Sequence, residues 1–351
     1  MGAAWSVITG ASGQYLERRH VTLLGGAQGE TALRDAERLL QTFGEPLEAG
    51  EIPPPNETTY IAGLPSLNTE DLVLTNVVIT QALSEQFVVF LGKIDTMDGD
   101  MNAFAHGRGK TQFLNTNFVF NPIAVQTTPY STLAAGFSIL RDFEPIFSFS
   151  VLNATDTATT SGFNELFADG VALAAELRLP TNLLGLPGHQ GIGAGWNSKE
   201  YIALNQDPRI VFPGVPIAAK DGSWNVKYNF DQYLYVDPCD STRGWGIFGR
   251  AGISDGNPNP LHWTVSLGVG GNSPICGREA DRFGIGWYYG AASPELGPFF
   301  TPDNGTGVEM FYNIAVTPWF QLTPDLQILD GGSMRNPDTA VIAALRGNLI
   351  F

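Results

Sequence analysis

Residues 262–270 read HWTVSLGVG, a stretch in which apolar and polar side chains alternate. Trp263 and Val265 fall on one face, and Thr264 and Ser266 fall on the other. A period of two is that of a β-strand with one apolar and one polar face. The same alternation recurs in residues 224–231, 282–289 and 309–316. The chain is therefore expected to be an all-β protein.

Extended along the chain, the alternation predicts strands that mostly span roughly 10–13 residues. Strands of globular proteins usually have about 5–6 residues, whereas about 9–11 residues cross a bilayer at a tilt. Strand length therefore favours a membrane β-barrel over a soluble β-sandwich. The predicted strands are residues 57–64, 71–81, 85–96, 132–141, 144–154, 170–180, 188–200, 223–236, 243–254, 260–271, 282–291, 305–318, 320–330 and 338–351.

The connections between these strands alternate in length. The short ones are residues 82–84, 142–143 and 318–319. The long ones are residues 97–131, 155–169, 201–222 and 292–304. A transmembrane barrel has this asymmetry, with short turns at one end and long loops at the other. We therefore predict a transmembrane antiparallel up-and-down β-barrel of 14–16 strands over residues 57–351.

Residues 1–56 differ from the rest of the chain. Apolar residues within 31–43 recur at helical spacing, and Pro53, Pro54 and Pro55 indicate a loop. This N-terminal segment is predicted to be partly helical or to supply incomplete barrel strands.

The composition is acidic and rich in aromatic residues. Lys and Arg number 19 against 35 Asp and Glu, so the net charge is −16. This charge excludes nucleic-acid binding as a main task, because phosphates need a basic surface. The aromatic content of 11% is too high for a disordered chain. A mean hydropathy of −0.00 fits a barrel whose lipid-facing apolar half and lumen-facing polar half cancel.

Aromatic residues gather at the predicted strand ends. Such side chains favour the membrane interface, where one end of the ring system is apolar and the other wet. The alternative is that they belong to an ordinary β-sheet core. The residues in question are Trp224, Trp245, Trp263, Trp319, Phe320 and Phe351.

Charged residues on the polar face of each alternating strand are predicted to line the pore. Among these residue types, arginine has a planar fork that can reach two vicinal hydroxyl groups of a solute. Any single residue of the set has a surface or rim position as its alternative. The candidates are Glu176, Arg178, Lys227, Asp231, Arg250, Arg282 and Glu309.

The connection 97–131 is too long for a plain turn, and long loops are usually functional or disordered. We expect it to fold into the lumen and narrow it, with an external loop as the alternative. Its candidate constriction residues are Asp98, Asp100, Asn102, His106 and Arg108, and the same connection also carries Lys110.

Two further features concern cysteine and metal chemistry. Cys239 and Cys276 lie in connections at the same end of the barrel, which predicts a disulfide; two unrelated thiols are the alternative. Asp95, Asp98 and Asp100 form an oxygen-rich cluster, for which a calcium site and an acidic turn are alternatives. The acidic turn is favoured, so neither a metal nor a cofactor is expected.

Several stretches resemble one known family. Residues 243–277, RGWGIFGRAGISDGNPNPLHWTVSLGVGGNSPICG, resemble the carbohydrate-selective porins of the OprB type. DRFGIGWYY at 281–289 and ALRGNLIF at 344–351 do so as well, as do the stretches 91–122 and 307–329. The resemblance covers about residues 70–351.

The resemblance implies a 16-stranded barrel in the outer membrane of a Gram-negative bacterium. It further implies passive passage of monosaccharides and related small hydrophilic solutes. Small-molecule sugars and outer-membrane lipid are then the expected partners, and a homo-oligomer such as a trimer is common among such barrels.

Three other functions remain open from the sequence. They are a general diffusion porin, an outer-membrane barrel hydrolase, and a soluble carbohydrate-binding β protein. Ser254, Asp255 and His262 contain the residue types of a catalytic triad, but neighbours of this kind arise by chance. No G-x-S-x-G or H-E-x-x-H motif occurs, so no catalytic residue is predicted and the chain is not expected to be an enzyme.

Overall fold

The computed structural model describes residues 5–9, 73–107, 109–205, 218–295, 304–330 and 339–350. The predicted helical stretch 31–43 and the predicted strand 57–64 lie outside the described residues, and so does Phe351. The proposed boundary between residues 56 and 57 also lies outside them.

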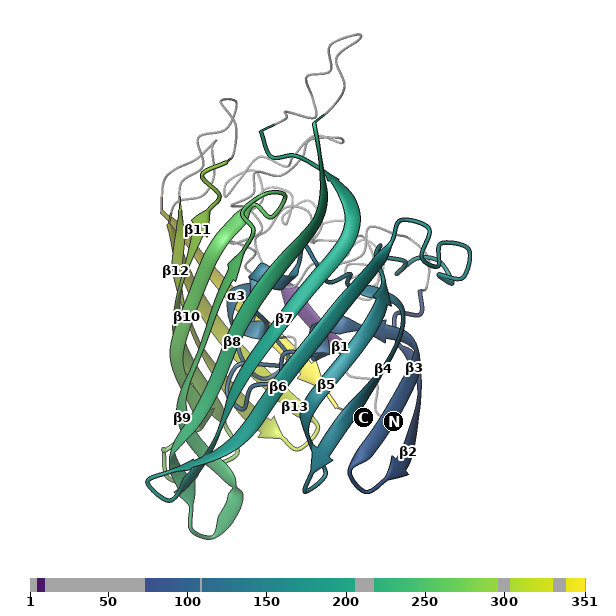
Figure 1. Ribbon diagram of the computed structural model, residues 1–351. Helices are drawn as coiled ribbons and strands as arrows, with labels where there is room; N and C mark the ends of the chain where they lie inside the picture. Colours follow the sequence, from purple (N-terminus) through teal and green to yellow (C-terminus); the bar gives the residue numbers. More distant parts are fainter. Residues whose placement is uncertain are drawn as a thin grey trace, which may run out of the picture.

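The described chain forms one antiparallel sheet of 14 strands (Figure 1). Strands β2 to β14 each pair with the next in chain order, and β1 pairs along β14. The predicted all-β, up-and-down architecture is therefore confirmed. The strands are β1 (Trp5–Thr9), β2 (Val77–Ser84), β3 (Phe87–Asp95), β4 (Ser131–Arg141), β5 (Glu144–Asn153), β6 (Val171–Leu183), β7 (Leu186–Ile202), β8 (Ala219–Asp237), β9 (Asp240–Ser254), β10 (Leu261–Asn272), β11 (Arg282–Ala292), β12 (Gly305–Thr317), β13 (Phe320–Asp330) and β14 (Ala340–Leu349).

The sheet has a short-turn end and a long-loop end. Tight turns join β2 to β3, β4 to β5 and β6 to β7, whereas 35 residues separate β3 from β4. That last connection contains the described helical elements, which are η2 (Thr96–Asp98), α3 (Thr116–Val119) and η3 (Pro122–Ala124). The predicted alternation of loop length thus matches the strand order.

The outward face of the sheet is apolar and exposed. Ile192 on β7 and Ile285 on β11 are 54% and 55% exposed, while their chain neighbours Gly193 and Gly286 face inward. A continuous exposed apolar face would be unfavourable in water and marks a surface that contacts another apolar phase. This face is the one that contacts lipid. Among the described residues, no helix is long and apolar enough to cross a membrane.

Aromatic residues form two levels on the outward face. Trp224 lies near the long-loop end of β8 and stands opposite Trp196, while Tyr235 lies eleven residues further on, near the short-turn end. At about 3.3 Å per residue and a tilt of about 35–45°, this separation corresponds to a height of about 25–30 Å. The apolar band of an outer-membrane barrel is about 25 Å tall. The spacing therefore fits two interfacial belts.

The predicted disulfide is wrong. Cys239 and Cys276 are both free and exposed. They do share the short-turn end, but β9 and β10 separate the turn after β8 from the connection after β10. Two strand spacings amount to about 10 Å, and disulfide-linked Cα atoms lie only about 4.4–6.8 Å apart. Placement at one end was therefore insufficient for a bond.

Candidate functional site

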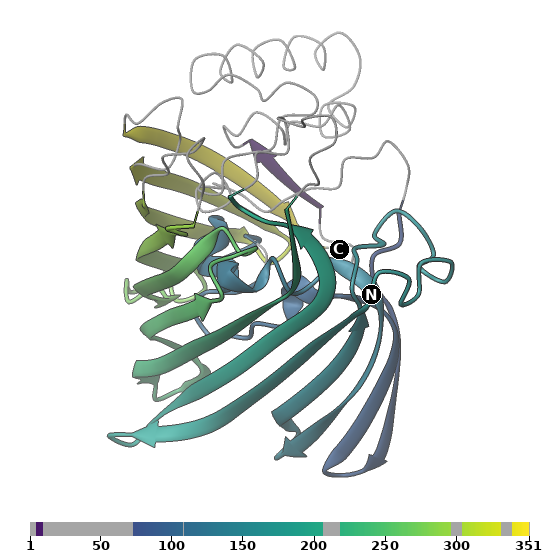
Figure 2. The same ribbon diagram turned by 45° about the horizontal axis from the view of Figure 1, so that its top comes forward.

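The connection between β3 and β4, residues 96–130, lies on the concave side of the sheet, and we call it the inner loop. Figure 2 shows α3 within the curve of the strands. Phe113 and Phe118 are fully buried and pack against the inward-facing Phe248 and Phe311, with ring centroids of Phe113 at 5.1 and 4.9 Å from those two rings. The inner loop therefore brings its own apolar core into the barrel.

Glycines on β11 permit this close packing. A Cβ on Gly284 would stand 2.7 Å from the Phe113 ring, and one on Gly286 would stand 2.6 Å from the Phe118 ring. Both distances are too short for a real side chain. Part of the glycine excess in the sequence thus serves the approach of the inner loop to the wall.

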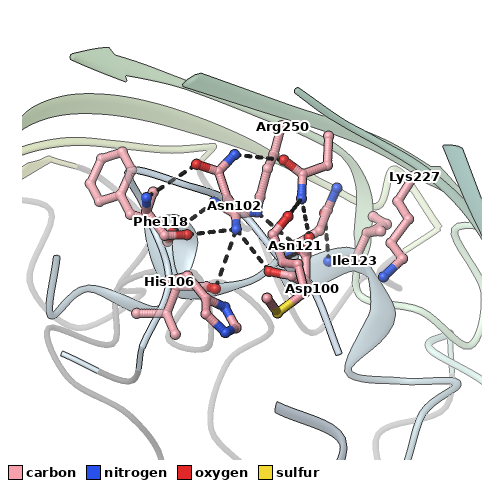
Figure 3. Close-up of polar contacts among 12 residues, drawn as sticks. Asp100, Asn102, His106, Phe118, Asn121, Ile123, Lys227 and Arg250 are labelled. Atoms are coloured by element: carbon pink, nitrogen blue, oxygen red, sulfur yellow. Dashed lines mark hydrogen bonds and ion pairs between the residues drawn. The ribbon is translucent and has the colours of Figure 1, made fainter. Parts of the chain in front are cut away.

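Arg250 on β9 fastens the inner loop to the wall (Figure 3). Its Nε donates to Asp100 Oδ2 at 3.1 Å, and its terminal nitrogens donate to the carbonyls of Phe118 and Ala105, each at 2.7 Å. The sequence predicts this residue to line the pore. The structure places it on the inner face but 2% exposed, because the inner loop covers it.

Asp100 is the loop partner of this arginine. Its Oδ2 also accepts the backbone N–H of Asn121 at 2.7 Å, and its Oδ1 accepts from the Asn229 side chain. Burial disfavours the charged form of Asp100. The charges of Arg250 and Lys227 and the Asn121 hydrogen bond outweigh burial, so the pKa of this carboxyl lies below its usual value.

We expect the attachment of the inner loop to resist mild acid. Because the folded state lowers the pKa of Asp100, the ion pair stabilises that state fully above the ordinary value of 3.8. This contribution is lost as the pH falls through the lower folded value. Channel recordings at stepwise lower pH should show loop-related conductance fluctuations only below 3.8, and Asp100→Asn should show them at neutral pH. A midpoint above 3.8 in the unaltered protein contradicts the assignment.

A second attachment lies on β12 to β14. The carboxylate of Glu309 accepts the backbone N–H groups of Leu114 and Asn115 at 2.6 and 2.8 Å. Arg346 pairs with Asp325 at 2.8 Å and donates to loop carbonyls, one of them that of Gln112 at 2.8 Å. Glu309, which the sequence also predicts to line the pore, is fully buried in these contacts.

Arg346 and Asp325 also hold the inner loop, although neither is among the residues predicted to line the pore. Both residues lie on the polar face of their alternating strands, and the same pattern identified Arg250 and Glu309. Parity places a side chain on the inner face. It does not tell whether a loop covers that side chain.

Two ion pairs on β6 to β8 remain accessible. Lys227 Nζ lies 3.0 Å from Glu176 Oε2, and Arg178 lies 3.1 Å from Asp231 Oδ2. His189 Nδ1 is 2.8 Å from the other Asp231 oxygen, and Asp231 itself is almost fully buried. The side chains of Lys227, Glu176 and Arg178 are about one-fifth exposed, consistent with partial access from the lumen.

These ion pairs meet the inner loop. A small hollow is lined by Asp100 from the loop and by Glu176, Arg178, Lys227 and Asn229 from the wall. Lys227 appears beside Asp100 and Arg250 in Figure 3. The tertiary fold therefore gathers four of the predicted charged residues at one place.

The remaining candidates have other positions. Asn102 donates to Asn229 Oδ1 at 2.7 Å and accepts from two loop backbone N–H groups, and the backbone N–H of His106 donates to Gln112. Arg282 is half-buried at the start of β11, at the short-turn end. Lys110 is exposed, and Arg108 and the Asp98 side chain lie outside the described residues.

The acidic turn has a structural explanation. Asp95 caps η2 by accepting the backbone N–H of Met97 at 3.2 Å, and Asp100 pairs with Arg250. Within the part of the chain that the structure describes, no three His, Cys, Asp or Glu residues are grouped as metal ligands.

The fold and the inner loop define the class as an outer-membrane β-barrel porin. The family model described as "Carbohydrate-selective porin, OprB family" matches residues 21–351. The chain belongs to this family, which is a family of transport channels, and the resemblance seen in the sequence is confirmed. It is an outer-membrane sugar porin of a Gram-negative bacterium.

A solved porin structure supports the fold. OprB of Pseudomonas putida at high pH is 18% identical, with a TM-score of 0.66 over 79% of this chain and 73% of that chain. Its low-pH form is 16% identical, with a TM-score of 0.47 over 79% and 67%. OmpT of Vibrio cholerae is 14% identical, with a TM-score of 0.45 over 76% and 78%. No curated protein matches the chain.

Proposed function

We propose that this porin conducts neutral monosaccharides and related small hydrophilic solutes passively, through a lumen that the inner loop narrows. The observation that carries the proposal is the pairing of charges on the accessible wall. Lys227 with Glu176, and Arg178 with Asp231, lie at 3.0 and 3.1 Å. Each cation has a carboxylate partner beside the inner loop.

Paired charges suit a neutral polyol. Each ion pair offers donors and acceptors to hydroxyl groups, while its net field on a distant ion is small because the opposite charges cancel. Sugar hydroxyls can exchange water for these groups one at a time. Conduction also requires that the solute leave, and such exchange leads to weak binding.

The pore-lining roles proposed here differ among the predicted residues. Glu176, Arg178 and Lys227 contact the solute, with Asp231 holding Arg178 in place. Arg250 and Glu309 act through the inner loop, because both are buried beneath it. A homo-oligomer such as a trimer stays a prediction, which cross-linking of the detergent-extracted protein tests.

Liposome swelling tests the proposal. Solutes of similar size but different charge should be compared: an aldohexose, a zwitterionic amino acid and a monocarboxylate, with a disaccharide as the larger sugar. We expect the aldohexose to enter several-fold faster than the charged solutes. Rates that follow solute size alone would reject selectivity and favour a general diffusion porin.

A matched variant links the result to the site. The double substitution Glu176→Gln with Lys227→Met removes one ion pair and leaves the net charge unchanged. It should lower the preference for the aldohexose without making the pore ion-selective. An unchanged preference would remove this pair from the solute pathway.

A further inference from the structure

We call the connection between β5 and β6, residues 154–170, the rim loop. The carbonyl of Ala154 accepts from the inward-facing Asn197, whereas residues 157–162 contact Lys93 and Leu133. Lys93 on β3 lies opposite Leu133 of β4, so both side chains are on the same face of the sheet. Leu133 has the parity of the exposed Ala135 and Ile139, which identifies this face as the outward one. Contacts of the rim loop with Lys93 and Leu133 therefore place it against the lipid-facing wall.

Lys93 fixes the first half of the rim loop. Its Nζ donates to the carbonyls of Thr157, Ala158 and Thr160 at 2.8, 3.1 and 2.6 Å. Three carbonyls satisfy all three donors of the ammonium group. The lysine is 8% exposed, since the rim loop lies over it.

The next residues continue across the outward face. A Cβ on Gly162 would stand 3.1 Å from Leu133 Cγ, so the backbone of the rim loop lies directly on this side chain. Gly162 has a φ of +81°, which glycine adopts readily. Figures 1 and 2 both show the rim loop beside the wall rather than over the opening.

The tip of the rim loop exposes large apolar side chains. Phe163, Leu166 and Phe167 are 72%, 42% and 51% exposed. The backbone N–H of Phe167 donates to Asn153 Oδ1 at 2.7 Å, which ties the tip to the end of β5. These three residues form the apolar tip.

We propose that the apolar tip is seated in the bilayer of the outer membrane, at the boundary between acyl chains and headgroups on the long-loop side. The surface on which the rim loop lies is continuous with the lipid-facing wall through Leu133. Phenylalanine and leucine gain most by leaving water, and the backbone of the rim loop is already held by Lys93 and Asn153. The apolar tip thereby anchors the β3–β5 side of the barrel in the lipid.

Spin labelling in vesicles of phosphatidylcholine and phosphatidylglycerol tests whether the apolar tip lies in the bilayer. In a Cys239→Ser, Cys276→Ser background, a nitroxide is placed at Phe163→Cys or Phe167→Cys. Collision rates are then measured with oxygen, which concentrates in lipid, and with a water-soluble nickel chelate. Thr159→Cys, an exposed polar position of the same rim loop, is the aqueous control, and Ile192→Cys is the lipid-facing control.

Labels at the apolar tip should give an oxygen-to-nickel ratio several-fold above that of Thr159→Cys and below that of Ile192→Cys, which lies deeper in the apolar band. A ratio equal to that of Thr159→Cys would overturn the proposal. Shielding from both reagents together with dipolar broadening between labels would also overturn it, because a second copy would then cover the tip. Leu166→Cys provides a further position if one variant fails to fold, and sugar-driven swelling checks folding in every case.

Discussion

Replacing Arg250 with alanine is expected to release the inner loop and to widen the pore. The substitution leaves the buried carboxylate of Asp100 without its guanidinium partner and removes donors from the carbonyls of Phe118 and Ala105. Breaking one side of a buried ion pair typically costs about 3–5 kcal/mol. We expect a higher and fluctuating single-channel conductance in planar bilayers, reduced discrimination among solutes, and a lower unfolding temperature in detergent.

Two variants make this test specific. Arg282→Ala also removes an arginine side chain, but from the start of β11 at the short-turn end, where Arg282 is half-buried. This substitution should leave the inner loop in place. Adding Asp100→Asn to Arg250→Ala removes the unpaired charge, so stability should recover in part while conductance stays altered. If Arg250→Ala shows the conductance and selectivity of the unaltered protein, other contacts hold the inner loop.

Replacing Lys227 with glutamate should make the pore cation-selective. The new carboxylate would face Glu176, whose Oε2 lies 3.0 Å from Lys227 Nζ, and would adjoin Asp100 across the same hollow. Like charges so placed favour entry of cations and repel anions. We expect the ratio of potassium to chloride permeability, taken from reversal potentials in a salt gradient, to rise several-fold, because a ring of carboxylates selects cations, and sugar entry to slow.

The matched controls separate position from charge. Lys220→Glu makes the same charge change at an exposed site near the long-loop end of β8 and should shift the reversal potential little. Lys227→Met removes the cation without adding an anion and should have an intermediate effect. Equal shifts from Lys227→Glu and Lys220→Glu would mean that the hollow is not the constriction.

Much of the wall could be predicted from local patterns. Strand parity placed Arg250, Glu309 and Lys227 on the inner face, because neighbouring side chains in a strand point to opposite sides. The alternation along a strand does not show whether a loop covers an inward-facing side chain. Arg250 and Lys227 have the same pattern in the sequence, yet one is sealed beneath the inner loop and the other is partly accessible.

The cysteines show the same limit at the end of the barrel. Strand counting correctly placed Cys239 and Cys276 at one end. A disulfide also needs two Cα atoms within a few ångströms, and that separation depends on how many strands lie between the turns. Sharing an end of the barrel is a weaker condition than being adjacent.

The sequence by itself determined the strands, the alternation of short and long connections, the lipid-facing side and the porin family. These features depend on neighbours in the chain, whose period of two is set by backbone geometry. Only the tertiary structure decided that Asp100 pairs with Arg250 and that the rim loop turns outward. It also decided that the Glu309 carboxylate accepts the backbone N–H groups of Leu114 and Asn115. Those contacts join residues far apart in the chain, and their partners follow from the path of each loop through space.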